Sequence, residues 1–254
     1  MNTYSAGIFA GLSEGNVIGN NSIHDVPHHA INLGNSGFSR NIVQFNDIRR
    51  TCLETSDTGA INCWMEDASQ TSLRQGHLIR YNLIADSSER GLYLDNDTSN
   101  CFVYGNVFVR CGQAILVHGG KNNVIENNVI LRCQVAVWCA NWINSFIANM
   151  KGFQTGNRFC HNIVCEVSKV LEPGSTLTDR TVAQSDQNLF FNTADADSYL
   201  KDRRQAGFEI HSLIADPLFV DPAHENYRLK PESPAFKLGF QAIEFAKIGP
   251  GGNH

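Results

Sequence analysis

Short apolar runs alternate with polar turns along most of the chain. Between Asn82 and Asn128, each unit holds a short apolar run, a polar or Gly turn, a second short apolar run and another turn. Units of roughly two dozen residues with two short strands each are typical of a solenoid, because one unit cannot bury its own apolar face and stacked units can. The pattern predicts an all-β fold, a parallel β-helix, whose coils pair at about 4.8 Å.

One Asn recurs at the same position of each unit. It falls at Asn21, Asn46, Asn82, Asn106 and Asn128, with looser copies at Asn162 and Asn188. Two of the six steps between these residues are about a dozen residues longer than one coil, which predicts inserted loops near residues 63–76 and 141–157. Stacked amide side chains at a repeated turn form hydrogen-bonded ladders, so we expect a structural role for these Asn residues.

A second series of apolar runs lies between the copies of the first. Its members are His29–Leu33, Gly59–Cys63, Gly91–Leu94, Gln113–Val117 and Val135–Trp138. We expect these runs and their turns to form one long exposed face. The pattern assigns residues 1–192 to coils and residues 193–254 to a C-terminal capping segment, with a short helix over 195–206 and a Pro-rich stretch that suits a sheet edge. The first coil starts in mid-pattern and leaves a sheet edge, so we expect a partner chain or a further segment to cover it.

Composition narrows the classes of function. The net charge is −5 and no basic patch stands out, which disfavours a nucleic-acid partner. No run of eighteen apolar residues occurs, so no membrane span is expected. The eight Cys residues form no paired CxxC motif, which disfavours a zinc site, and no cofactor is expected. We expect these Cys residues to be buried as small hydrophobic residues, although stacked positions also permit disulfides.

Carboxylate, His and aromatic residues gather on the exposed face. Counted from the small residue that precedes Ile or Leu in each run, Asp95 aligns with Trp64 one coil before and with His118 one coil after. Two carboxyl groups that flank a bond can hydrolyse a glycoside, because one protonates the leaving oxygen and the other activates water or attacks. We interpret the face as a glycan site, with these candidate substrate-binding residues: His28, His29, Glu54, Trp64, Tyr93, Asp97, His118 and Trp138.

Five stretches along the coils and one near the C-terminus carry a family resemblance. They are His24–Asn35, Glu54–Ile61, Gly91–Asn96, Val103–Phe108, His118–Gly120 and Asp216–Ala235. Together they resemble right-handed parallel β-helix carbohydrate-active enzymes, nearest to glycoside hydrolase family 141. The resemblance implies a right-handed solenoid, secretion, fucosidase-like or xylanase-like action on a plant or microbial polysaccharide, and catalysis by Asp57 and Asp95. This chain departs from the family where it has Asn62, Cys63 and Trp64 in place of a Tyr-containing run, and Asn96 in place of a second Asp.

Strand counting raises a difficulty for that pair. Asp57 precedes its strand and Asp95 follows the next one, so a straight ladder would leave them well over about 10 Å apart. Either hydrolytic geometry needs roughly 5–9.5 Å, and the pair therefore requires a bulge or a loop that brings the two together.

Three alternatives stay open. A polysaccharide lyase would need a Lys or Arg base, and Arg90, Lys121 and Arg132 are the residues available near Asp95. The oxygen-bearing run from Asp95 to Asp97 could bind Ca²⁺. A non-catalytic glycan-binding solenoid would use the three Trp residues, Trp64, Trp138 and Trp142.

Overall fold

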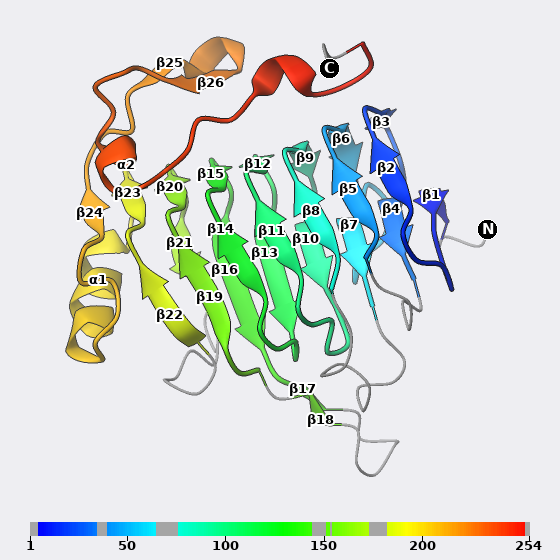
Figure 1. The fold of residues 1–254 in the computed structure, drawn as a ribbon, viewed down its shortest axis with the longest axis horizontal. Coiled ribbons are helices and arrows are strands. Elements are labelled where there is room, and N and C mark those ends of the chain that lie inside the picture. The colour runs from blue at the N-terminus through cyan, green and yellow to red at the C-terminus, as the bar shows by residue number, and fades with distance from the viewer. Residues whose placement is uncertain are drawn as a thin grey trace.

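The computed structural model describes residues 5–34, 40–64, 76–143, 151–152, 154–172 and 182–251. The chain winds into a solenoid with three parallel sheets along its length (Figure 1). Neighbouring strands in each sheet come from consecutive coils and pair in parallel, as in β10 (Arg90–Leu94) with β13 (Gln113–His118). The prediction of an all-β parallel β-helix is confirmed.

The three sheets are named here A, B and C. Sheet A, which contains the second predicted series of runs, consists of β1 (Ala6–Phe9), β4 (His29–Leu33), β7 (Gly59–Cys63), β10, β13, β16 (Val135–Ala140) and β21 (Lys169–Leu171). Sheet B consists of β2 (Val17–Gly19), β5 (Ile42–Gln44), β8 (Leu78–Arg80), β11 (Phe102–Tyr104), β14 (Val124–Glu126), β19 (Asn157–Cys160) and β22 (Val182–Asp186). Sheet C consists of β3 (Ser22–His24), β6 (Asp47–Thr51), β9 (Leu83–Ser87), β12 (Val107–Val109), β15 (Val129–Leu131), β20 (Ile163–Cys165), β23 (Leu189–Phe191) and β24 (Leu213–Ile214).

The prediction of two strands per coil is wrong, because a sharp turn splits the first run of each unit into one strand of sheet B and one of sheet C. The residue before each recurring Asn has a left-handed backbone, with φ between 53° and 65°. Such a residue cannot continue a strand, so the chain changes direction there. These residues are Asn20, Phe45, Tyr81, Gly105, Asn127, His161 and Gln187.

The recurring Asn residues form the expected ladder at this turn. Each side-chain Nδ2 donates to Oδ1 of the Asn in the next coil at 2.9–3.2 Å, from Asn21 to Asn188. Each Oδ1 also accepts the backbone N–H of the preceding ladder Asn. At the last rung, Nδ2 of Asn188 donates to the buried carboxylate of Glu209 at 3.0 Å. The ladder therefore satisfies amides that would otherwise be buried without partners.

The solenoid interior is filled by aliphatic side chains and Cys. All eight Cys residues are buried and free, in agreement with their expected role as small hydrophobic residues. At the last coils, α1 (Ala196–Gln205) covers the interior and places Ala196 and Leu200 in this core. The helix expected over 195–206 is thus confirmed. No helix among the described residues is long and apolar enough to cross a bilayer.

The rest of the C-terminal segment lies along the outer face of sheet C (Figure 1). It contains β25 (Phe219–Asp221), η2 (Pro222–His224), β26 (Asn226–Leu229), α2 (Pro234–Lys237) and η3 (Phe245–Lys247). Its end reaches the first coils, where the N–H of Gly249 donates to the carbonyl of Phe45 at 2.8 Å. The segment after residue 192 therefore covers both the last coil and the length of one sheet.

The first inserted loop falls largely outside the described residues, and the second falls partly outside them. Of the expected loop near 141–157, the structure describes an antiparallel pair, β17 (Trp142–Ile143) and β18 (Lys151–Gly152), which lies apart from the three sheets. Residues 65–75, which belong to the other expected loop, are outside the described ranges.

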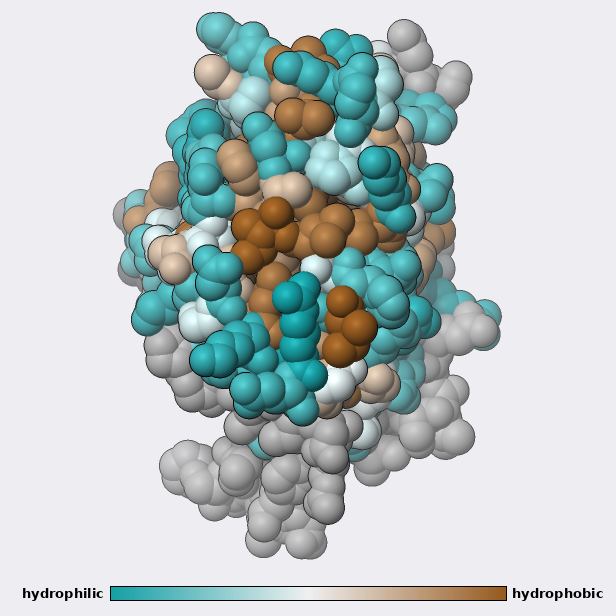
Figure 2. All heavy atoms as spheres, turned by 90° about the vertical axis from the view of Figure 1, so that its left-hand side faces the viewer, coloured by the Kyte–Doolittle hydropathy of each residue, from teal (hydrophilic) through white to brown (hydrophobic). Residues whose placement is uncertain are grey.

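The two ends of the solenoid expose apolar side chains. In the first coil, Phe9 and Val17 are exposed on the edge strands of sheets A and B. Figure 2 shows the opposite end, where brown apolar side chains lie among polar ones. Leu213 and Ile214 of the edge strand β24 are exposed at that end.

Candidate functional site

The register of sheet A brings Asp95 beside His118. Leu94 pairs with Cys63 in β7 and with Val117 in β13, so the next residue, Asp95, aligns with Trp64 and His118 as predicted. Nδ1 of His118 lies 2.8 Å from Oδ1 of Asp95, which also accepts the N–H of Asn96 at 2.8 Å. Asp95 is therefore held by two donors while its side chain stays partly open to solvent.

A long loop between β6 and β7 brings Asp57 over the same face. Only residues 88–89 separate the equivalent strands one coil later, whereas residues 52–58 separate β6 from β7. Asp57 is exposed near the end of this loop, with φ of 56°. Its Oδ1 accepts a hydrogen bond from the hydroxyl of Tyr93 at 3.1 Å. The long loop thus brings Asp57 to Tyr93 of the next coil, a shift that counting residues along a straight ladder did not include.

Tyr93 connects the two candidate carboxylates. Burial, and then the negative charges of Asp95 and Asp57, raise the pKa of Tyr93 well above its ordinary value. Its phenol therefore stays protonated and donates to Asp57, while the charge of Asp95 lies nearby. Gly59 makes this placement possible, because a Cβ there would lie 2.8 Å from Cβ of Tyr93.

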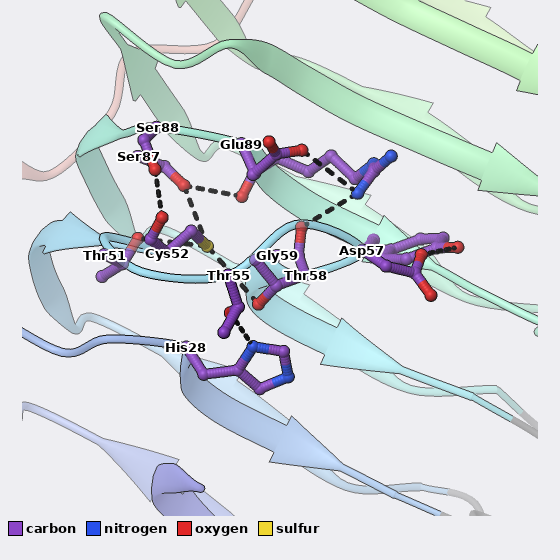
Figure 3. Close-up of polar contacts among 12 residues, drawn as sticks. His28, Thr51, Cys52, Thr55, Asp57, Thr58, Gly59, Ser87, Ser88 and Glu89 are labelled. Atoms are coloured by element: carbon purple, nitrogen blue, oxygen red, sulfur yellow. Dashed lines mark hydrogen bonds and ion pairs between the residues drawn. The ribbon is translucent and has the colours of Figure 1, made fainter. Parts of the chain in front are cut away.

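Two buried His residues support the loop that carries Asp57. Figure 3 shows His28 pointing toward Thr55, and the two side chains are hydrogen-bonded. Nδ1 of His29 lies 2.9 Å from Oγ1 of Thr58 and 3.0 Å from the carbonyl of Gly59. Burial lowers the pKa of both imidazoles, that of His29 to about 4. Both rings lie under the loop that carries Asp57, so they position it and do not line the open face.

Arg90 extends the site along sheet A. Its guanidinium carbon lies 4.8 Å from the ring centroid of Tyr93 and 5.8 Å from that of Trp138. It also forms an ion pair with Glu89 at 3.4 Å and donates to the carbonyl of Thr58 at 3.4 Å. Sequence reasoning considered Arg90 only as a base for a lyase. Strand alternation would place Arg90 and Tyr93 on opposite faces, so the sequence gives no signal for this contact.

The other candidate residues lie less centrally. Asp97 is completely buried, and its carboxylate accepts no hydrogen bond within the part of the chain that the structure describes. Burial raises the pKa of Asp97 to about 6, against the opposing charge of Lys121. The backbone N–H of Asp97 donates to the carbonyl of His118 at 2.9 Å, which makes it a support for that residue.

Glu54 and Trp64 point elsewhere. Glu54 is exposed on the loop, where its backbone N–H bonds to the carbonyl of Pro27. The indole of Trp64 lies against Gly34 of the preceding coil, at a distance that leaves no room for a Cβ there. The side chain of Trp142 is outside the described residues.

The structure also places the residues that the sequence offered for metal binding and for a lyase base. Within the described ranges, no group of three or more His, Cys, Asp or Glu residues could hold a metal ion. Arg132 pairs with Glu166 at 2.7 Å at the turn after sheet C, and Lys121 lies near Asp97. Neither cation contacts the carboxylate pair, so Arg90 is the cation of this site among the described residues.

Comparison with known proteins places the fold in a family. Two overlapping stretches, residues 1–159 and 66–212, match the family model described as "right handed beta helix region". The chain belongs to the right-handed β-helix family. This match confirms the expected fold and its handedness.

One relative of this β-helix chain and one similar solved structure are much longer than it is. The uncharacterized protein YwoF of Bacillus subtilis (strain 168) is 27% identical over 145 residues, which are 54% of this chain and 26% of that protein. A solved structure, the complex of XylC with xylose, superposes with a TM-score of 0.43 and 17% identity over 82% of this chain and 39% of its own. The chain thus spans about a quarter and about two fifths of these two proteins.

Proposed function

We propose that this chain is a glycoside hydrolase that cleaves a polysaccharide with Asp57 and Asp95 as its carboxylate pair. One observation carries the proposal: the loop before β7 places Asp57 on the Tyr93 hydroxyl, beside Asp95 at the end of β10. Both carboxylates raise the pKa of this phenol, which supports a pair close enough for glycoside hydrolysis.

The contacts suggest a division of roles. Asp95 accepts hydrogen bonds from His118 and from the N–H of Asn96, which supports its assignment as the base or nucleophile. Asp57 is exposed near the end of the loop, where it can reach a bound glycan, and it takes the remaining role of the acid that protonates the leaving oxygen. In this scheme Trp138 and Arg90 form a platform beside the reacting sugar.

The proposal also names an enzyme family and a class of substrate. The motifs around His24–Asn35 and Glu54–Ile61 favour glycoside hydrolase family 141, with fucosidase-like or xylanase-like activity on a plant or microbial polysaccharide. A polymer of this kind is degraded outside the cell, so the proposal includes an extracellular site of action.

The test uses purified protein on a panel of neutral and acidic polysaccharides. We expect reducing ends to appear with at least one polymer, and we expect the rate to fall about 10³-fold in both Asp57→Asn and Asp95→Asn, since acid–base catalysis typically contributes 10²–10⁴-fold. Glu232→Gln, an exposed residue of the C-terminal segment, is the matched control and should leave the rate unchanged. Unaltered rates in both Asn variants would refute the pair, and unsaturated product ends would identify a lyase.

A second candidate is a glycan-binding solenoid without turnover. The packing of Arg90 between the Tyr93 and Trp138 rings favours it, because aromatic and planar groups stack on sugar faces. Glycan binding that is unchanged in Asp57→Asn and Asp95→Asn, with no product from the unmodified chain, would select this function.

A further inference from the structure

We infer that a polar hollow beside the candidate site binds a second sugar unit and selects neutral glycans over polyuronates. This inference rests on the proposed function and names the substrate class of the same face. The hollow has a volume of about 250 Å³. That is well above the roughly 10–15 Å³ that holds one water, and it leaves room for a single sugar ring.

The hollow is built from the turns that enter sheet A. Its lining residues are Ser88, Glu89, Gly112, Gln113, Gln134, Val135 and Glu172. Gln113 and Val135 begin β13 and β16, and Glu172 directly follows β21. The N–H of Glu172 donates to the carbonyl of Val137, so this residue stands one coil beyond Trp138 in the outward row. The hollow thus lies at the edge of sheet A where these strands begin.

The hollow is connected to the carboxylate pair through contacts that the structure shows. Glu89 in its wall pairs with Arg90, and the Arg90 guanidinium packs on the ring of Tyr93. Tyr93 in turn donates to Asp57. A glycan whose reacting unit lies over Tyr93 would therefore place a neighbouring unit over Glu89 and the hollow.

The lining favours hydroxyl groups. Glu89 and Glu172 offer only acceptors, and the amides of Gln113 and Gln134 offer acceptors and donors. Adjacent sugar hydroxyls, each able to donate, match such an array of acceptors.

The same lining disfavours a uronate. It carries two carboxylates and no cation among the described residues. The adjacent cation, Arg90, already contacts Glu89 and the carbonyl of Thr58, and Lys169 continues the row of Val135 without lining the hollow. A carboxylate-bearing sugar would meet like charge there, which works against its binding.

The experiment separates binding from turnover. Calorimetry on the Asp57→Asn/Asp95→Asn chain would use cellohexaose, xylohexaose, mannohexaose and hexagalacturonate as probes, each with its disaccharide. We expect at least one neutral hexasaccharide to bind and hexagalacturonate to bind at least tenfold more weakly. Adding Glu172→Gln or Gln134→Ala should weaken the neutral hexasaccharide about tenfold and leave the disaccharide unchanged. Adding Glu232→Gln as the control should change neither.

The outcomes distinguish this inference from the proposed function. Hexasaccharide affinity that is the same with and without Glu172→Gln and Gln134→Ala overturns the inference, as does hexagalacturonate binding as tight as that of the neutral probes, or no binding at all. In any of these cases, product formation by the unmodified chain would still support the hydrolase. Conversely, binding that depends on Glu172 without any product formation would support the hollow and remove the hydrolase.

Discussion

Sheets A and C have opposite outer faces, although the same coils build both. From β9 to β23 the outward residues of sheet C are mostly apolar, and the C-terminal segment buries them in a second core. The outward rows of sheet A carry polar and aromatic residues instead, among them Asn62, Arg90 and Tyr93, and the loop that carries Asp57 reaches over them. In a solenoid the interior repeats in every coil, so the outward residues decide which face is covered and which can bind a ligand.

The largest expected difference between the two faces is in stability. Tyr227 of β26 is buried on sheet C, in ring contact with Phe219 and Phe245, so Tyr227→Ala should lower the free energy of unfolding by about 3–5 kcal/mol. Trp138→Ala on sheet A removes a half-buried ring and should cost less than about 1 kcal/mol. Urea unfolding followed by far-ultraviolet circular dichroism measures both. Equal losses would mean that the C-terminal segment does not stabilise the coils it covers.

A part of this contrast could be predicted from the sequence. The period of the repeat fixed the register, so the alignment of Asp95 with His118 followed from counting. The third strand did not follow, because the left-handed residue at the splitting turn varies between types as different as Phe45 and Gly105. The approach of Asp57 to Tyr93 depends on the conformation of one long loop, which no period specifies.

The covered face was also missed, although the sequence carried a signal for it. Leu83, Val107 and Val129 point outward from sheet C at positions where a solvent-exposed face would carry polar residues. The partner that buries them is more than eighty residues away in the chain, and pairing at that separation cannot be read from a local pattern. A row of outward apolar residues in a solenoid is best interpreted as a docking surface for another segment.

The second prediction concerns pH and the loop on sheet A. The pKa of His29 is about 4 in the folded chain and about 6.5 when unfolded, so the unfolded state binds more protons between these values. Stability therefore falls as the pH drops from 6.5 toward 4, and His29 accounts for up to about 3 kcal/mol of that loss. His29→Gln removes this group.

The measurement for His29 is a difference between two chains. Both the unmodified chain and His29→Gln are unfolded in urea at several pH values between 7 and 4. The difference between them cancels the titration of two other groups that both chains share. Burial lowers the pKa of His77 to about 4, and it raises that of Asp97. The variant should lose less stability than the unmodified chain as the pH falls. A stability gap that is constant across this range would show that His29 is not buried as a neutral ring.

The smallest expected effect concerns the ionic contact that fastens the C-terminal segment to sheet C. Glu225 accepts from Arg49 at 2.8 Å and from Arg110 at 3.0 Å, and all three side chains are partly exposed. Glu225→Gln should therefore cost only about 0.5–1 kcal/mol, and less at high salt, because exposed pairs are weak and screened. Urea unfolding at low and high salt, with Glu232→Gln as control, measures this. A loss as large as that of Tyr227→Ala, or one that salt does not reduce, would assign the attachment of this segment to the ion pairs and not to apolar burial.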